Sequence, residues 1–243
     1  AFSTMRTDGA SQGAYAQFNI NPYCGDAPEH VAQNLHSLCR VLGIAPSNLV
    51  MPHQTHETTV RQVGRELLSM PQNVRQMVLE GVDALITNVP GVCIGVSTAD
   101  CIPILLYDAE HRATAAIHAG WRGTVKRIAQ NAIAQMRAAF NTNPRTLRAV
   151  IAPGISLQHF EVGDEVYEAF AKAAFPMNDI AQRHNKWHIN LPLCNQLQLQ
   201  ELGVKAENIY ATDICTYNRC NDFFSARRLG INSGRIFTGV AIR

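Results

Sequence analysis

Three residues whose side chains commonly bind metals, His56, Cys101 and His118, lie beside small residues where apolar, strand-like segments end. A thiolate and two imidazoles from separate strand ends can converge on one tetrahedral ion, with Zn–S near ~2.3 Å and Zn–N near ~2.0 Å. Three protein ligands would leave the fourth position of zinc to water, whose pKa then falls to roughly 7. These residue types therefore allow an open, catalytic zinc site.

The same residues also allow chemistry without a metal. Cys101 could act as a nucleophile and His118 as its base, with Asp100 or another acceptor orienting the imidazole. Asp100 could equally cap or pair locally at the end of a strand. His53 precedes His56 by three residues, and we expect it to orient the loop or bind nothing. The spacing alone leaves both interpretations open.

Several familiar catalytic classes lack their motifs in this sequence. There is no His-x-His pair, which argues against a multicopper oxidase with its many imidazole ligands. There is also no Pro-Cys-x-x-Cys segment of the known zinc deaminase type, no Gly-rich phosphate loop with its Lys, and no dinucleotide fingerprint. The sequence signatures of these familiar classes are therefore absent.

Length and composition indicate one folded domain over residues 1–243. The chain is 47% apolar and 16% charged, as in a protein with a buried core, and single cores grow to roughly 250 residues before they divide. A net charge of +2, without a long run of Lys and Arg, argues against nucleic acid as a partner. Composition leaves the oligomeric state open.

Targeting signals and disulfide patterns are not recognisable in the sequence. No apolar stretch reaches the roughly 18 residues that span a bilayer, so we expect no membrane partner. Seven Cys residues at irregular spacing, without a Cys-x-x-Cys pair, indicate reduced thiols and not a disulfide framework. A cytoplasmic location follows as the default expectation.

Helices and strands must position the three candidate residues. Apolar residues at helical spacing predict a helix that starts near Pro28, with Asp26 and Glu29 at capping-box spacing, and ends at Gly43. A long helix is predicted from a cap at Thr124 up to the segment before residue 144, and further helices at residues 164–175 and 191–202.

Short segments rich in Val, Ile and Ala predict strands at residues 82–89, 92–97, 102–107, 112–118, 147–151 and 208–211 and at the C-terminus. Several of these strands follow one another without a helix between them, which favours a mixed or antiparallel sheet over a strictly alternating parallel one. The expected fold class is α+β (mixed α/β), a single domain with mixed β-sheets flanked by helices.

Motifs along nearly the whole chain resemble one known family. The two most specific segments are Thr98-Ala99-Asp100-Cys101 and His118-Ala119-Gly120-Trp121-Arg122-Gly123. Other matching segments, in chain order, are Phe2-Ser3-Thr4, Phe18-Asn19, Gly25-Asp26, Gln54-Thr55-His56, Gly81-Val82-Asp83-Ala84-Leu85, Phe160-Glu161-Val162-Gly163, Cys215-Thr216-Tyr217, Phe223-Phe224-Ser225 and Arg227-Arg228. With these residues the sequence resembles the YfiH-type family, whose members are also labelled polyphenol oxidase or laccase-domain proteins.

The resemblance implies a zinc site formed by His56, Cys101 and His118, which would also be the catalytic residues. It implies a purine nucleoside enzyme that phosphorolyses adenosine, inosine, guanosine or methylthioadenosine, deaminates adenosine, or does both. Zinc is preferred over copper, because the oxidase label fits the ligand chemistry poorly. The expected partners are a small-molecule nucleoside and phosphate.

Three other functions stay open at this point. The family shares its fold in outline with the deamidase domain of cytotoxic necrotizing factor toxins, so a Cys/His amide hydrolase or an editor of cell-wall precursors is the main rival. A polyphenol oxidase is the historical label. A zinc-stabilised binding module is a non-enzymatic alternative, although such sites usually have four protein ligands.

Four residues are predicted to bind substrate. Arg122, Arg227 and Arg228 are candidates for a phosphate clamp, because guanidinium groups match phosphate oxygens. Asn19 lies in a segment similar to a substrate-side loop of the family, and its amide could read a purine edge.

The chain departs from the family pattern at two positions. Leu35 stands where many relatives have Arg, and Leu229 stands where they have Asp after the double Arg. If either charge helps to bind phosphate, we expect phosphorolysis to be weaker here.

Overall fold

The computed structural model of the protein describes residues 1–242 and contains three β-sheets. The largest sheet is mixed and has the strand order β12-β8-β6-β7-β4-β3. Its central strands β4, β7, β6 and β8 pair in antiparallel fashion, whereas the outer pairs β3–β4 and β8–β12 are parallel. The strands are β3 (Val60–Gln62), β4 (Ala84–Thr87), β6 (Ile102–Asp108), β7 (Ala113–Ala119), β8 (Arg148–Ile151) and β12 (Ile209–Ala211). The predicted mixed sheet is confirmed.

A second sheet packs against one face of the first. Its strand order is β1-β13-β5-β2, with β1 (Phe2–Ser3), β2 (Leu49–Val50), β5 (Cys93–Thr98) and β13 (Ile236–Ala241). Ile94 and Val96 of β5 share a buried cluster with Leu85, Leu105 and Ala116 of the first sheet. The side chains of two sheets therefore form the inner layer of the core, which agrees with the near-continuous apolar runs of β5, β6 and β7.

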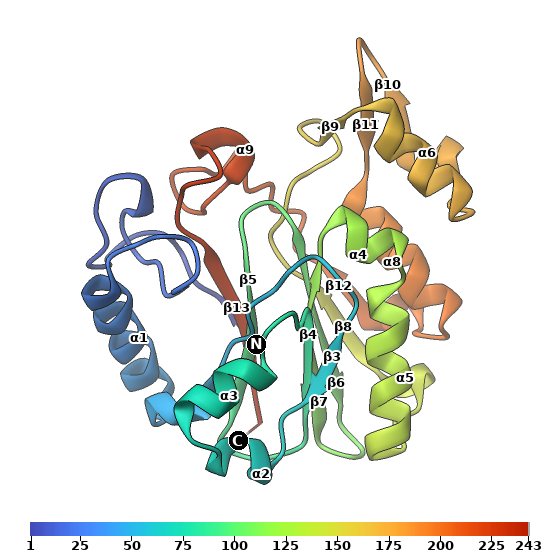
Figure 1. Ribbon diagram of the computed structural model, residues 1–243. Helices are drawn as coiled ribbons and strands as arrows, with labels where there is room; N and C mark the ends of the chain where they lie inside the picture. Colours follow the sequence, from blue (N-terminus) through green and yellow to red (C-terminus); the bar gives the residue numbers. More distant parts are fainter. Residues whose placement is uncertain (243) are drawn as a thin grey trace.

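Helices cover the outer faces of these two sheets (Figure 1). Helices α5 (Ile128–Phe140) and α8 (Leu191–Glu201) pack on the six-stranded sheet, because α5 buries one stripe of Ile, Ala and Met residues at helical spacing. Helix α1 (Pro28–Leu42) packs on the four-stranded sheet through Leu38 and Cys39. The predicted helix ending at Gly43 is confirmed, and Gly43 has the left-handed backbone typical of a helix C-terminus.

Shorter elements surround this frame. The small helices are α2 (Arg65–Ser69), α3 (Gln72–Val78), α4 (Trp121–Val125), α6 (Asp164–Lys172), α7 (Met177–Ile180) and α9 (Ala226–Leu229). A three-stranded sheet of β9 (Glu161–Val162), β10 (Ala181–Arg183) and β11 (Trp187–Ile189) projects from the body of the molecule (Figure 1). These strands have two or three residues each, too few to show a period-two pattern in the sequence.

Three predicted details of the helices are wrong. The single helix from Thr124 to Phe140 is two helices, because Arg127 between α4 and α5 has a left-handed backbone with φ 64°. Thr124 is buried inside α4 and does not cap it; its hydroxyl accepts a hydrogen bond from the Asn195 amide at 3.2 Å. Likewise the residue before α1 is Ala27, and Asp26 makes no cap bond to the helix.

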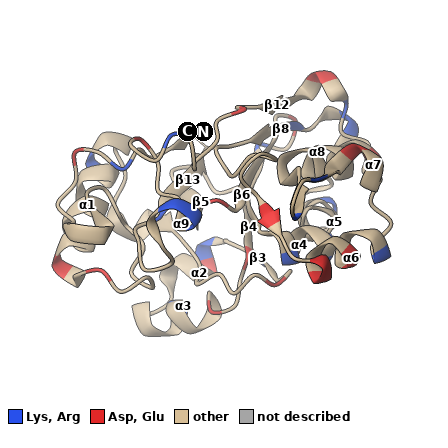
Figure 2. Cartoon of the chain, turned by 90° about the horizontal axis from the view of Figure 1, so that it is seen from above, with Lys and Arg blue, Asp and Glu red and all other residues tan. Residues whose placement is uncertain are grey.

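The surface carries charges of both signs. Seen from above in Figure 2, Lys and Arg positions are interspersed with Asp and Glu positions, and the basic helix α9 lies beside the ends of β5 and β13. Within residues 1–242 every helix is too short or too polar to cross a bilayer.

Candidate metal centre

The structure brings the three predicted ligands together. The metal-binding atoms of His56, Cys101 and His118 all lie within 4.8 Å of one another. The two imidazole rings meet edge to face, with 4.8 Å between centroids and 73° between planes. His56 lies 45 residues before Cys101, and Cys101 lies 17 residues before His118. Side chains that are distant along the chain thus form one cluster. A cluster of these three side chains could hold a single metal ion.

His118 is held in place by a buried carboxylate. It lies on β7 and is 3% exposed, and its Nδ1 is 2.7 Å from Oδ1 of Asp83, which is fully buried. Asp83 directly precedes β4, the neighbour of β7, and its carbonyl accepts the backbone N–H of His118 at 2.8 Å. An acceptor at Nδ1 selects the tautomer whose Nε2 is free to bind a metal. Asp83 is therefore the acceptor that orients the imidazole.

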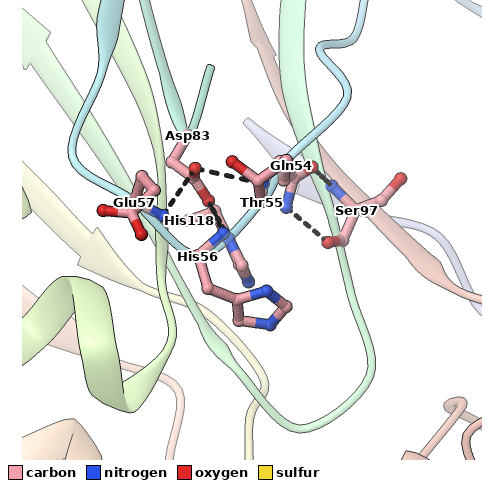
Figure 3. Close-up of polar contacts among 7 residues, drawn as sticks. All are labelled: Gln54, Thr55, His56, Glu57, Asp83, Ser97 and His118. Atoms are coloured by element: carbon pink, nitrogen blue, oxygen red, sulfur yellow. Dashed lines mark hydrogen bonds and ion pairs between the residues drawn. The ribbon is translucent and has the colours of Figure 1, made fainter. Parts of the chain in front are cut away.

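The same carboxylate holds the loop that carries His56 (Figure 3). Asp83 accepts backbone N–H groups from Thr55 at 3.2 Å, His56 at 3.0 Å and Glu57 at 2.9 Å. His56 lies in a loop and not at a strand end, and its φ of 65° is one that non-glycine residues rarely adopt. Three amide hydrogen bonds to one carboxylate offset the cost of this backbone conformation. Asp83 thus positions two of the three ligands.

Cys101 follows a second strained residue. Asp100 has φ 88°, and its carboxylate accepts the hydroxyl of Thr216 and the backbone N–H of Arg227, both at 2.7 Å. Asp100 therefore stabilises the turn before β6. The acceptor that orients the His118 imidazole is Asp83 and not Asp100. A Cβ added at Gly120 would lie 3.0 Å from the His56 ring and 3.1 Å from the Cys101 sulfur, so any larger residue there would crowd the cluster.

The imidazoles control the charge of the cysteine. Burial alone would raise the pKa of Cys101, but His118 and His56 lower it to about 6. Burial alone would lower the pKa of His118, but the Cys101 thiolate and Asp83 raise it to about 9. Burial would also raise the pKa of Asp83, yet hydrogen bonds from His118 and backbone amides lower it. A thiolate with two imidazoles suits zinc and copper, so the donor set fits a metal site.

The three ligands open into a cleft of about 220 Å³ that has an aromatic wall. His53 and Tyr23 stack there with 4.1 Å between ring centroids. The His53 Nδ1 is 2.8 Å from the Glu80 carboxylate, and its backbone N–H donates to Leu79. His53 therefore orients the loop, as expected, and lies outside the ligand cluster. A basic residue that the sequence did not single out, Arg235, also lines the cleft.

The four predicted substrate residues lie outside the lining of this cleft. Asn19 is fully buried, and its amide donates to Asp26 at 2.8 Å and accepts the backbone N–H of Arg235 at 3.1 Å. The guanidinium of Arg122 lies 4.3 Å from the Trp121 ring centroid. Whether these residues contact substrate stays a prediction.

The Arg pair of α9 has protein partners of its own. Arg227 donates to the Glu161 carbonyl at 3.0 Å, and the Arg228 guanidinium lies 4.9 Å from the Tyr217 ring centroid. Leu229 is 36% exposed on the same helix. No carboxylate at position 229 therefore holds the Arg pair in this chain.

One signal in the sequence could have identified Asp83. An ionisable residue inside the apolar segment Gly81-Val82-Asp83-Ala84-Leu85 must be buried with a partner. The pairing of β4 with β7, which the sequence does not show, makes that partner His118.

Fold and site together define a mixed α/β protein with a cleft lined by a His–Cys–His cluster that could hold a metal ion. The model of the multi-copper polyphenol oxidoreductase laccase family matches residues 1–243, and the chain belongs to this family. A purine nucleoside phosphorylase of Bacteroides thetaiotaomicron is 48% identical over 99% of this chain and 90% of its own length. The adenosine deaminase RL5 of an unknown prokaryotic organism is 44% identical over 99% and 92%.

A solved structure supports the same assignment at the level of the fold. The hypothetical protein YfiH of Bacillus licheniformis superposes with a TM-score of 0.92 and 24% identity over 99% of this chain and 91% of its own. The purine nucleoside phosphorylase YfiH of Escherichia coli is 33% identical over 94% of this chain and 88% of its own length. The resemblance to the YfiH-type family is confirmed by this relative, and the fold class by the solved structure.

Proposed function

We propose that this protein is a zinc-dependent purine nucleoside enzyme that phosphorolyses purine nucleosides, deaminates adenosine, or does both. The observation that carries the proposal is the His56–Cys101–His118 cluster at the floor of an open cleft. The names of two relatives, a purine nucleoside phosphorylase and an adenosine deaminase, support the substrate class. The expected small-molecule partners are therefore a nucleoside and phosphate.

Zinc is the metal proposed for the cluster. When bound, it would supply a Lewis acid that makes water or a substrate oxygen more acidic at neutral pH. The donor set contains only one thiolate and two imidazoles, and residues 1–242 hold one such cluster. A multicopper oxidase needs several copper sites, so the oxidase name of the family is a poor guide to this chain.

The chain's own residues would bind and orient the nucleoside. The stacked rings of His53 and Tyr23 offer a flat aromatic wall for a purine. Asp83 keeps His118 and His56 in fixed positions, so that the substrate meets a preorganised site. Arg122, Arg227, Arg228 and Asn19 remain proposed substrate residues that mutagenesis must test.

The two reactions differ in their bonds. Phosphorolysis breaks the bond between C1′ and the purine nitrogen, forms a bond from C1′ to a phosphate oxygen, and leaves a purine that takes up a proton. Deamination adds water at C6 and releases ammonia. Incubating the zinc-loaded protein with adenosine, with and without phosphate, separates them by product: adenine with ribose 1-phosphate, or inosine. No turnover under either condition would remove the purine proposal.

A thiol-dependent amide hydrolase is the second candidate, because the pKa of Cys101 is lowered beside His118. This alternative predicts full activity of the metal-free protein and its inactivation by iodoacetamide. The zinc proposal predicts loss of activity with a chelator and its recovery when zinc is returned. Assaying the same preparation under these conditions decides between them.

The ligand assignment has a matched pair of variants. His56→Ala should abolish bound zinc, because it removes one of three ligands. His53→Ala should keep most of the zinc, since its ring bonds Glu80 and lies outside the cluster. Metal analysis after gel filtration measures both. Equal loss of zinc from the two variants would contradict the assignment.

A reducing, cytoplasmic location is part of the proposal. All seven cysteines are free thiols within the described residues, as is usual for proteins of reducing compartments. Fusing a fluorescent protein to the chain and imaging the cells would test it.

A further inference from the structure

One cationic side chain shares the cleft with the three ligands. Arg235 directly precedes β13 and is half-buried. Among the residues that line the cleft it is the one Lys or Arg, beside His56, Cys101 and His118. Burial among protein groups fixes its position, whereas the exposed guanidiniums of Arg227 and Arg228 lie outside the lining.

The guanidinium of Arg235 is bound by neutral groups. It donates to the backbone carbonyls of Ser233, Gly234 and Ile231, with distances of 3.0 Å to Gly234 and 2.9 Å to Ile231. Within residues 1–242 it forms no ion pair with a carboxylate. Carbonyl oxygens orient a guanidinium without cancelling its charge. The positive charge of Arg235 is therefore available to a ligand.

A chain of buried amides supports this position. The Asn19 side-chain oxygen accepts the backbone N–H of Arg235 at 3.1 Å, and the Asn34 amide donates to the Asn19 carbonyl at 2.9 Å. Both Asn residues are buried. Asn19, which the sequence predicts to bind a purine, thus holds the backbone of Arg235 in place.

The net charge of the cluster determines whether the cleft attracts an anion. A zinc ion would be balanced by the Cys101 thiolate and the Asp83 carboxylate, so the cluster as a whole would be close to neutral. The excess positive charge that attracts an anion then comes from Arg235. A planar, fully charged guanidinium is well matched to the oxygens of a phosphate group.

We propose that Arg235 forms an anion subsite in the cleft, which binds a phosphate group next to the metal centre. This subsite rests on the proposed function, in which inorganic phosphate attacks C1′ of the nucleoside while the bond from C1′ to the purine breaks. Hydrogen phosphate loses its proton as it bonds to C1′, and the departing purine takes up one proton in return. The same chemistry would also recognise the 5′-phosphate of a nucleotide, and the two sources differ in their kinetics.

The test compares Arg235→Met with Arg75→Met in the zinc-loaded protein. Arg75 is a matched control, because it is also half-buried and donates to a backbone carbonyl, that of Ser47, but lines a different groove. Arg235→Met should raise KM for phosphate about 10-fold to 100-fold, whereas Arg75→Met should leave it within about twofold of wild type. Arg235→Lys should give a smaller rise.

Other outcomes are equally informative. A lower kcat/KM for adenosine 5′-monophosphate, with an unchanged KM for phosphate, would assign the subsite to the nucleotide's own phosphate. Unchanged kinetics for both anions in a folded, zinc-containing Arg235→Met protein would overturn the proposal. Circular dichroism and metal analysis establish folding and zinc content.

Failure of the proposed function can be told apart from failure of the subsite. If the wild-type protein does not turn over adenosine, calorimetric titration with inorganic phosphate still tests Arg235. Binding by wild type and by Arg75→Met, and its loss in Arg235→Met, would retain the subsite without the purine activity. Equal binding by all three proteins, or no binding by any, would remove it.

Discussion

The two ends of strand β5 carry thiols with opposite properties. Cys93 begins the strand, is fully buried beside Phe237 and Leu38, and has its pKa raised by burial to about 12. Cys101 follows the other end of β5, where burial acts in the same direction but His118 and His56 lower its pKa to about 6. The comparison indicates that neighbouring imidazoles lower the pKa of a thiol that burial alone would raise.

The largest expected difference between the two ends is in alkylation. In metal-free, folded protein at pH 7, iodoacetamide should modify Cys101 at least about 1000-fold faster than Cys93, because the reactive form is the thiolate. The rate at Cys101 should rise as the pH passes about 6 and then level off. Peptide mass spectrometry measures both sites. Rates at Cys101 that keep rising up to pH 9 would show that the imidazoles do not stabilise its thiolate.

The second largest expected difference between the two thiols is in zinc binding. Loss of a residue that only hydrogen-bonds a ligand lowers metal affinity by up to roughly 100-fold. Cys101→Ala removes a proposed ligand itself and should lower zinc affinity by more than that. Cys93→Ala should keep full zinc content and lower the free energy of unfolding by about 1–2 kcal/mol through lost packing. Zinc titration with a chromogenic chelator and urea unfolding make the two measurements. A Cys101→Ala protein that still binds zinc tightly would refute the ligand set.

A pair of buried carboxylates sharpens the comparison further. Asp83 bonds His118, and Asp108 bonds His111 at 2.9 Å in the same sheet, away from the cleft. Asp83→Asn should weaken zinc binding about 10-fold to 100-fold, because it disturbs the tautomer and orientation of a ligand. Asp108→Asn should leave zinc affinity unchanged and cost about 1–3 kcal/mol of stability. Similar zinc affinities in the two variants would mean that Asp83 has no role beyond folding.

The smallest expected effect is on stability in acid. Burial alone would raise the pKa of Asp108, but hydrogen bonds from neighbouring groups, including His111, lower it below its usual value of 3.8. A lowered carboxyl pKa stabilises the fold above that value, and this contribution is lost as the pH falls through the folded pKa. Between pH 5 and pH 3, metal-free wild type should lose on the order of 1 kcal/mol more than Asp108→Asn. Urea unfolding at each pH tests this, and equal losses would contradict it.

Elements with strong local patterns could be predicted from the sequence. The helix before Gly43 and the buried strands β5, β6 and β7 match their expected ranges within one or two residues, because each buries a regular series of apolar side chains. The break between α4 and α5 could not be predicted. There the Arg127 guanidinium lies 4.2 Å from the Phe175 ring centroid and donates to the Ala173 carbonyl, so contacts with a distant segment accompany its left-handed backbone.

Some residues of the candidate site could be predicted from the sequence, and others could not. His56, Cys101 and His118 were recognisable because imidazole and thiol groups in characteristic short motifs are chemically distinctive. Asp83, which bonds His118, and Arg235, the cation proposed for an anion subsite, could not be recognised in the same way. Aspartate and arginine are common in any sequence, and their roles here depend on strand pairing and on a backbone turn.

The amino-acid sequence by itself determined the core strands, the main helices, the family and the three side chains able to bind a metal. The tertiary structure decided which carboxylate holds His118, which loop conformation presents His56, and that Arg235, not the Arg pair of α9, lines the cleft. Local patterns record which faces are buried. Partners far apart in the chain are chosen by sheet register and by the satisfaction of buried polar groups, which exist only in the folded molecule.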